Sequence, residues 1–171
     1  MTGRNTVLSK SDSAREARLY LEDFAVGQVF RSGSVTVTRE DIKGYAARYD
    51  PQPFHLDEVA AKETLFGGLA ASGWHTMSLT MRLLVDGGAP IAGGIIGAGT
   101  DELRWPRPVR PGDRLRAESE VLEVQPSRSR PEQGRMRLRT TTFNQNDEPV
   151  LIFIANLIVP RRPAWAAPSH T

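Results

Sequence analysis

The chain has 171 residues, of which 39% are hydrophobic and 25% charged, a composition typical of one globular domain with a sizeable core. It contains no cysteine, which excludes disulfide scaffolds, thiolate zinc sites and cysteine nucleophiles. The net charge is only +2, and arginine and glutamate are mixed along the predicted strands instead of forming one basic face, so we expect no nucleic-acid partner.

Both ends of the chain are polar, and the segment between them has no repeat and no linker. Residues 1–18 are predicted to be a disordered lead, residues 19–160 one domain, and residues 161–171 a flexible tail. The lead lacks the hydrophobic centre of a signal peptide. No apolar run approaches the roughly 20 residues that span a bilayer. We therefore expect no membrane association and a cytoplasmic location.

The domain is predicted to begin with a strand and a short helix. Residues 34–38 alternate β-branched and polar side chains, a pattern that indicates a strand. Thr38 followed by Asp41 is typical of a helix N-cap with an acidic first turn, and the helix should continue through Ala47.

The next segment, residues 49–57, reads Tyr-Asp-Pro-Gln-Pro-Phe-His-Leu-Asp. Each proline fixes its own φ and moves the preceding residue toward extended geometry, which predicts a stiff loop and no helix here. Such a loop would hold Asp50 and His55 at a fixed distance and orientation, as proton-transfer chemistry requires. The alternative is a polar turn in which Asp50 caps a helix and His55 is an ordinary surface residue.

A longer helix follows a stretch of small residues. A short helix over residues 55–64, with Asp57 near its N-terminus, should precede it. Gly87 and Gly88 should end the long helix. Its apolar residues recur at spacings of three and four, which predicts one face packed on a sheet. The residues of that predicted face are Trp74, Met77, Met81, Leu84 and Val85.

The rest of the chain is predicted to form strands separated by turns. A polar, proline-containing loop over residues 125–134 indicates a hairpin. The order of one strand, helices and then four strands predicts an α+β domain, in which an antiparallel sheet packs on the long helix. The four predicted strands cover residues 95–105, 113–125, 135–144 and 150–160.

Three ordered motifs resemble the MaoC-like dehydratases, a family that includes the (R)-specific enoyl-CoA hydratases. Residues 50–57, D-P-Q-P-F-H-L-D, are similar to the family signature D-x-N-P-[LIV]-H-x-D. Residues 66–73 resemble its F-G-x-x-[IV]-[AV]-H-G stretch, and residues 103–113 its L-[RK]-[FW]-x-x-P-V-x-x-G-D turn. The resemblance implies the hot-dog fold, a curved antiparallel sheet wrapped around a long central helix.

The resemblance also implies a site and a reaction. Asp50 and His55 match the family's catalytic pair, and the backbone N–H of Gly73 matches the group that holds the thioester carbonyl. We expect reversible addition of water to a 2-enoyl-CoA, giving a 3-hydroxyacyl-CoA with (R) stereochemistry. The substrate is then an acyl-CoA, no cofactor or metal is needed, and the chain should form a homodimer or a higher homo-oligomer.

Some motif positions depart from the family pattern. Gln52 stands in place of the usual Asn, Ser72 in place of a His, and Met81 where some members carry a Ser. Loss of that hydroxyl leaves open whether Met81 alters the usual activity. The residues expected to contact substrate are Gln52, Pro53, Phe54, Ser72, Trp74 and Met81.

Two other functions stay open at this point. A thioesterase on the same fold usually takes its acid from the central helix, and residues 74–85 contain no Asp or Glu. A non-catalytic acyl-CoA-binding protein would bind ligand without turnover. The acyl group, the residues that meet the CoA phosphates and the choice of base between Asp50 and His55 are not determined by the sequence.

Overall fold

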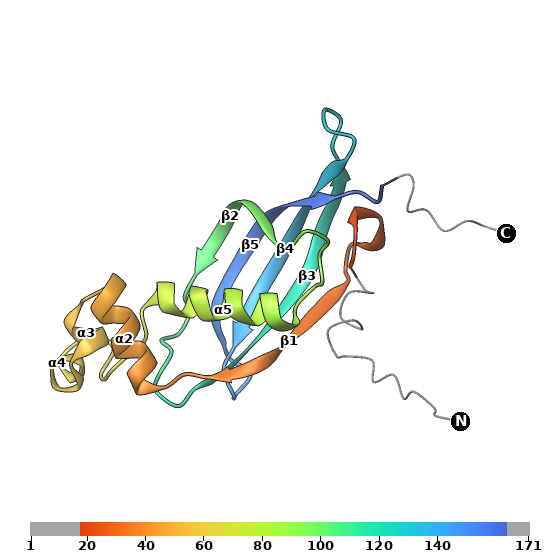
Figure 1. Ribbon diagram of the computed structural model, residues 1–171. Helices are drawn as coiled ribbons and strands as arrows, with labels where there is room; N and C mark the ends of the chain where they lie inside the picture. The colour runs from red at the N-terminus through yellow and green to blue at the C-terminus, as the bar shows by residue number, and fades with distance from the viewer. Residues whose placement is uncertain (1–17, 164–171) are drawn as a thin grey trace, which may run out of the picture.

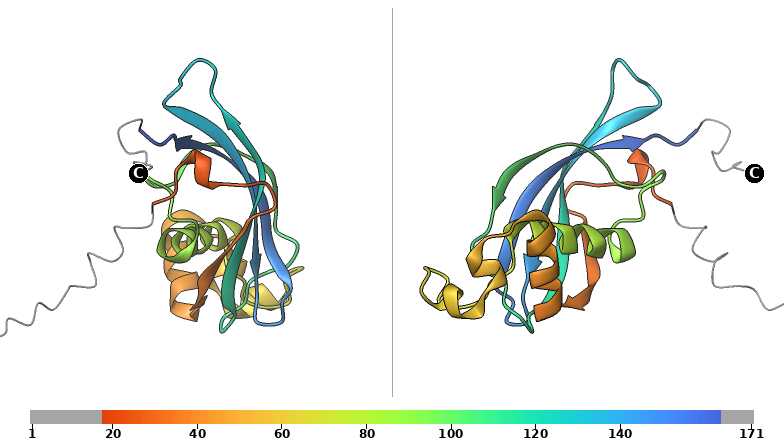
Figure 2. Two further views of the ribbon diagram at one scale, coloured as in Figure 1. Left: turned by 90° about the vertical axis from the view of Figure 1, so that its right-hand side faces the viewer. Right: turned by 60° about the vertical axis from the view of Figure 1, so that its left-hand side comes forward.

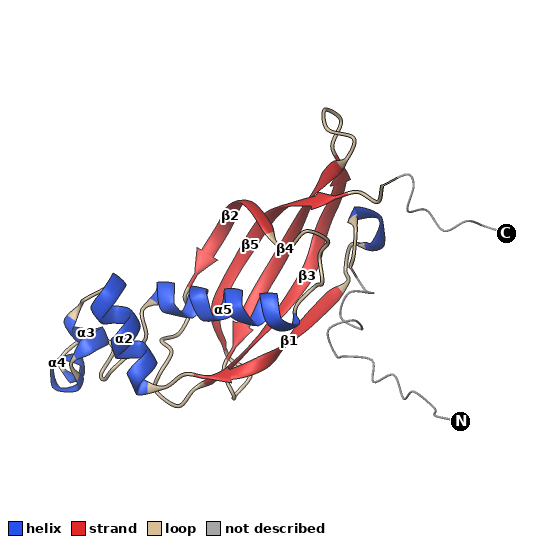
Figure 3. Ribbon diagram, in the orientation of Figure 1, coloured by secondary structure: helices blue, strands red, loops and turns tan. Residues whose placement is uncertain are grey.

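A five-stranded antiparallel sheet forms one layer of the molecule, and the long helix α5 (Gly73–Gly87) lies across one face of it (Figures 1 and 3). The computed structural model describes residues 18–163. The strands lie in the order β1-β3-β4-β5-β2, and the sheet curves around the helix (Figure 2). This is the α+β, hot-dog arrangement expected from the sequence. The strands are β1 (Val29–Thr36), β2 (Ile96–Arg104), β3 (Arg114–Pro126), β4 (Gln133–Phe143) and β5 (Pro149–Pro160).

The predicted lead and tail lie almost wholly outside the described residues. Three residues assigned to the tail, 161–163, are described, and two of them contact the short 3-10 helix η1 (Leu21–Asp23). The Arg161 guanidinium bonds Glu22 at 2.8 Å, and that of Arg162 bonds Asp23 at 2.7 Å. These two arginines therefore pack at the start of the domain.

Helix α2 (Arg39–Tyr49) begins and ends where local chemistry requires it. The Thr38 hydroxyl accepts a hydrogen bond from the Asp41 N–H at 3.1 Å, which confirms the predicted N-cap. The helix ends because Pro51 disfavours the α conformation at Asp50, which has φ −152° and ψ 66°. Asp50 is thereby held at the C-terminus of α2, with its N–H bonded to the Ala46 carbonyl at 2.9 Å.

The prediction that residues 49–57 contain no helix is wrong. Residues Pro53–Leu56 form a single helical turn, α3, and Pro53 occupies its first position. Proline fits there because the first residue of a helix needs no N–H partner and its fixed φ is already helical. The predicted helix over 55–64 is consequently divided at Asp57, which caps the separate helix α4 (Glu58–Lys62) through Val59 and Ala60.

Helix α5 has the predicted extent, and the predicted packing face is right only in part: Met77, Met81 and Leu84 face the sheet, whereas Trp74 and Val85 do not. The residues buried against the sheet include Thr76, Thr80 and Leu83. Trp74 is 56% exposed and Val85 66% exposed. Threonine is small enough for the helix to approach the sheet closely. In addition, Thr80 Oγ1 and Thr142 Oγ1 on β4 are 2.7 Å apart, so the polar atoms under the helix satisfy one another.

Strand β2 forms one edge of the sheet and pairs only with β5 among the described strands. Eight of its nine residues are exposed. None of the helices between residues 18 and 163 has the length and apolarity needed to cross a lipid bilayer.

Candidate active site

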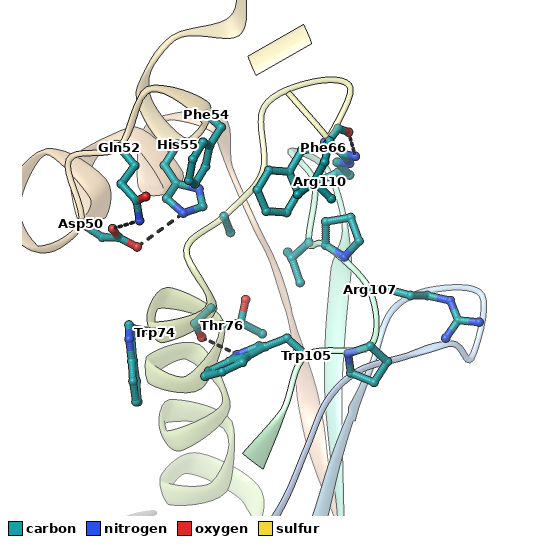
Figure 4. Close-up of a pocket in the computed structure, with 16 residues that line it drawn as sticks. Asp50, Gln52, Phe54, His55, Phe66, Trp74, Thr76, Trp105, Arg107 and Arg110 are labelled. Atoms are coloured by element: carbon teal, nitrogen blue, oxygen red, sulfur yellow. Dashed lines mark hydrogen bonds and ion pairs between the residues drawn. The ribbon is translucent and has the colours of Figure 1, made fainter. Parts of the chain in front are cut away.

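Asp50 and His55 face each other across the turn between α2 and α3 (Figure 4). His55 Nε2 lies 3.4 Å from Asp50 Oδ2, and the imidazole side chain is only 5% exposed. The short distance follows from the chain path: the end of α2 fixes Asp50, and the Pro53-initiated turn fixes His55. The sequence-predicted pair is therefore brought together, and the surface-histidine alternative is wrong.

The protonation of His55 is constrained on its other nitrogen. Nδ1 lies 2.7 Å from the carbonyl oxygen of Ala70. A carbonyl only accepts, so Nδ1 must carry a hydrogen and donate it. In neutral His55 the lone pair is then on Nε2, beside Asp50. One water molecule can donate to Nε2 and to the Asp50 carboxylate at the same time.

The Asp50 carboxylate is stabilised in its ionised form. Partial burial acts to raise its pKa, but hydrogen bonds with Ser72 and Gln52, together with the charge of His55 when protonated, hold the pKa below its ordinary value. The Gln52 amide donates to Asp50 Oδ1 at 2.6 Å. Gln52 therefore makes a supporting bond from the position where the family usually has Asn.

The N-terminus of α5 supplies a backbone donor to the same region. Ser72 is fully buried and caps the helix by accepting from the Trp74 N–H at 3.2 Å. Gly73 is the first helical residue, so its own N–H has no acceptor within the helix and lies at the positive end of the dipole. This position can stabilise negative charge on a ligand.

Trp105 fixes the surroundings of Gly73. Its indole Nε1–H donates to the Gly73 carbonyl at 2.9 Å, and its ring stands edge-to-face with Trp74 at 5.5 Å. A Cβ added at Gly73 would lie 2.7 Å from Trp105 Cε2, closer than any real contact. Only glycine fits beneath this indole.

These groups line a cavity of about 510 Å³, a size ordinary for a small-molecule site. Six predicted site residues lie in its wall: Asp50, Gln52, Phe54, His55, Gly73 and Trp74. Three do not line it. Pro53 is exposed at the start of α3, Ser72 is buried at the N-cap of α5, and Met81 is two turns further along α5.

Several other residues of the cavity wall were not predicted from the sequence. Most of them belong to the second motif, residues 66–73, or to the third, residues 103–113, so these motifs were the available signal. Only Leu65 and Thr76 lie outside both motifs and reach the cavity through the tertiary fold. The unassigned residues are Leu65, Phe66, Ala71, Thr76, Trp105, Pro106, Arg107, Pro108, Val109 and Arg110.

Met81 lines a second, smaller cavity of about 100 Å³ between α5 and the sheet. Its wall is mainly apolar, with Met77 and Leu84 from the helix and Leu138 and Phe153 from the sheet. Within residues 18–163 no three His, Asp or Glu side chains converge as metal ligands.

Comparison with known proteins gives consistent likenesses. The family model of the MaoC-like domain matches residues 23–143. A MaoC-like dehydratase of Rhodospirillum rubrum, known from its crystal structure, is 55% identical, with a TM-score of 0.83 over 85% of this chain and 99% of its own. The (R)-hydratase of Pseudomonas aeruginosa is 29% identical, with a TM-score of 0.69 over 85% of this chain and 88% of its own.

A third relative is named for a reaction. The 3-hydroxybutyryl-CoA dehydratase of Methylorubrum extorquens is 32% identical over 147 residues, which are 84% of this chain and 86% of that protein. The two solved structures confirm the predicted hot-dog fold. The segment matched by the family model contains Asp50, His55 and Gly73.

Proposed function

Because the chain belongs to the MaoC-like dehydratase family, we propose that it reversibly adds water to a 2-enoyl-CoA and so forms a 3-hydroxyacyl-CoA. Hydratase or dehydratase activity follows from the family. The thioester substrate is the finer part of the proposal. One observation carries it: the Asp50–His55 pair lines the same cavity as Gly73, the first residue of α5.

In the hydration direction, Asp50 and His55 jointly hold the attacking water. His55 Nε2 accepts one proton of the water while the water oxygen bonds to the β-carbon of the enoyl group. The Asp50 carboxylate orients the water and stabilises the imidazolium that forms 3.4 Å away. The lowered pKa of Asp50 suits this role, because a weakly basic carboxylate stays ionised.

Addition at the β-carbon moves an electron pair onto the thioester carbonyl. The Gly73 N–H at the start of α5 stabilises the resulting enolate oxygen. The proton on His55 Nε2 then passes to the α-carbon, which regenerates neutral His55 and completes the addition of one water. No cofactor takes part, since the thioester itself makes the α-position acidic. We assign (R) stereochemistry because the fold and sequence are similar to an (R)-hydratase.

The decisive assay separates hydration from thioester cleavage. Loss of enoyl absorbance from 2-enoyl-CoAs of increasing chain length, without release of free CoA, is the expected result. Release of CoA as the main event would instead favour the thioesterase, which the lack of Asp and Glu over residues 74–85 argues against. Tight binding with neither event would favour a non-catalytic acyl-CoA-binding protein.

We further propose that the protein is a homodimer or a higher homo-oligomer. The edge of β2, which no other strand within residues 18–163 covers, and the exposed apolar side chains of α5 support this proposal. Val85→Glu should shift the protein toward the monomer in size-exclusion chromatography with light scattering. Val59→Glu, on α4 and 75% exposed, is the matched control and should leave the oligomer intact.

A further inference from the structure

Arg110 lies on the turn before β3, and its guanidinium is surrounded by backbone carbonyls of a distant loop. Nη1 donates to the Gly68 carbonyl at 2.7 Å and to the Leu69 carbonyl at 3.1 Å. Nη2 donates to the Phe66 carbonyl. The Arg110 N–H bonds Asp113 Oδ2 at 2.8 Å, so the arginine itself is held in place.

The loop that Arg110 holds is linked to His55 through one hydrogen bond. The residue that follows Leu69 is Ala70, and its carbonyl accepts the hydrogen of His55 Nδ1. Gly67 has φ +61° and Gly68 φ +155°. These backbone conformations let three carbonyls of one short loop turn toward the same guanidinium. The planar fork of arginine can donate to three carbonyls at once, which the compact ammonium of lysine cannot do.

We propose that Arg110 is a positioning residue: by holding the backbone of residues 66–69, it fixes the Ala70 carbonyl and so keeps His55 in the Nδ1–H tautomer. The proposal rests on the proposed hydration for its effect on turnover. Its structural part stands on the hydrogen bonds alone.

The tautomer of His55 affects the reaction because Nε2 lies beside the Asp50 carboxylate. If the Ala70 carbonyl moved, His55 could carry its hydrogen on Nε2 and donate it to Asp50 at 3.4 Å. Nε2 would then be a donor, and the imidazole would offer no acceptor for a proton of the water. Arg110 therefore acts on the reaction through the backbone and through His55, without touching the reacting atoms.

The direct test is a nitrogen-15 spectrum of the imidazoles. The chain has three histidines, and His55→Gln identifies the His55 signals by their loss. His75, buried against Tyr45 at a ring distance of 4.7 Å, serves as an internal reference. The wild-type protein should show neutral His55 protonated on Nδ1. Arg110→Ala should show a mixture of tautomers at His55 and no change at His75.

Kinetics provide the second readout. Arg110→Ala should lower kcat on the order of 100-fold with little change in KM, because the misplacement affects the catalytic group. Guanidinium ion, added below denaturing concentration, should restore part of the activity. Arg110→Lys keeps the charge and the stem but should not restore kcat, and it replaces Arg110→Ala in both measurements if the alanine variant does not fold. Arg114→Ala, an exposed arginine four residues later, is the control and should match the wild type.

Three results would overturn the proposal: Nε2–H in the wild-type protein, an unchanged tautomer in the Arg110 variants, or a rise in KM with kcat unchanged. The last result would instead mark Arg110 as a contact for the anionic part of the substrate. A wild-type protein without hydratase activity, but with the expected tautomer change in the variants, would refute the proposed function and leave the positioning role standing.

Discussion

Two groups of buried polar side chains lie along α5, and they differ in whether their polar atoms bond only other protein groups or also border the cavity of about 510 Å³. Under the body of the helix, Thr80 pairs with Thr142 at 2.7 Å and Ser119 with Thr140 at 2.8 Å. At its N-terminus, His55 lies at the wall of this cavity, beside Asp50.

The hydroxyl pairs are closed, in the sense that each hydroxyl bonds another protein group and none lines that cavity. The Thr80 hydroxyl donates to the Thr76 carbonyl at 2.9 Å, so Thr142 must donate to Thr80, and both side chains are fully buried. The His55–Asp50 pair is open, because neutral His55 leaves an acceptor next to a carboxylate. The difference indicates that closed polar groups specify the packing of the helix, whereas open ones are available for chemistry.

Gly73→Ala is expected to have the largest effect among the variants that leave both Asp50 and His55 in place. The added Cβ would lie 2.7 Å from the Trp105 ring, so the indole and the start of α5 must move apart. We expect kcat/KM for hydration to fall on the order of 100-fold, comparable to losing one oxyanion donor.

The control for this variant is Gly44→Ala in the interior of α2, where an added Cβ meets nothing within 4 Å. That variant should keep its activity and gain about 0.5–1 kcal/mol of unfolding free energy in denaturant titrations. A kcat/KM of Gly73→Ala equal to that of the wild type would contradict the proposed role of the Gly73 N–H.

A change on the closed side should alter stability and leave activity alone. Thr80→Val removes the acceptor of the buried Thr142 hydroxyl. We expect a loss of about 1–3 kcal/mol in the free energy of unfolding, measured by urea titration. The double variant Thr80→Val with Thr142→Val should recover much of that loss, because no polar atom is then left unpaired. A large fall in kcat at unchanged stability would contradict the comparison.

The smallest expected effect concerns the titration of Asp50. Gln52→Leu removes the amide donor 2.6 Å from Oδ1, so the pKa of Asp50 should rise toward its ordinary value of about 3.9. Because the folded pKa is the lower one, the ionised carboxylate stabilises the fold. Its contribution is complete above the unfolded pKa and is lost as the pH falls through the folded pKa.

Carbon-13 titration of the Asp50 carboxyl, assigned with Asp50→Asn, measures this shift. In Gln52→Leu, the stability contribution should be smaller, and it should be fully lost at a higher pH than in the wild type. An Asp50 pKa in the wild type at or above the ordinary value would contradict the description of the site.

The sequence predicted features whose cause is local. The Thr38 cap and the end of α5 at Gly87 and Gly88 follow from side-chain and backbone preferences within a few residues. The motif around Asp50 and His55 indicated a rigid pair for the same reason, although the single turn at Pro53 was missed because proline was treated only as a helix breaker.

Features that depend on distant contacts could not be predicted. The spacing of apolar residues identified α5 as amphipathic, but it did not indicate that the small, hydrogen-bonded Thr76 and Thr80 are more buried than the apolar Trp74 and Val85. The bonds of Arg110 join residues 41 to 44 positions apart. Likewise, the Trp105 contact with Gly73 spans 32 positions. Only the folded backbone brings these groups to the site.

The central claim is that Asp50 and His55 act as one unit on the water. Hydration of a 2-enoyl-CoA by Asp50→Asn, by His55→Ala and by the double variant tests it most directly, with circular dichroism to confirm the fold. We expect each single variant to lose about 10²–10⁴-fold in kcat, and the double variant to be little worse than the poorer single one. Turnover near the wild-type rate in either single variant, or losses that multiply in the double variant, would contradict the account.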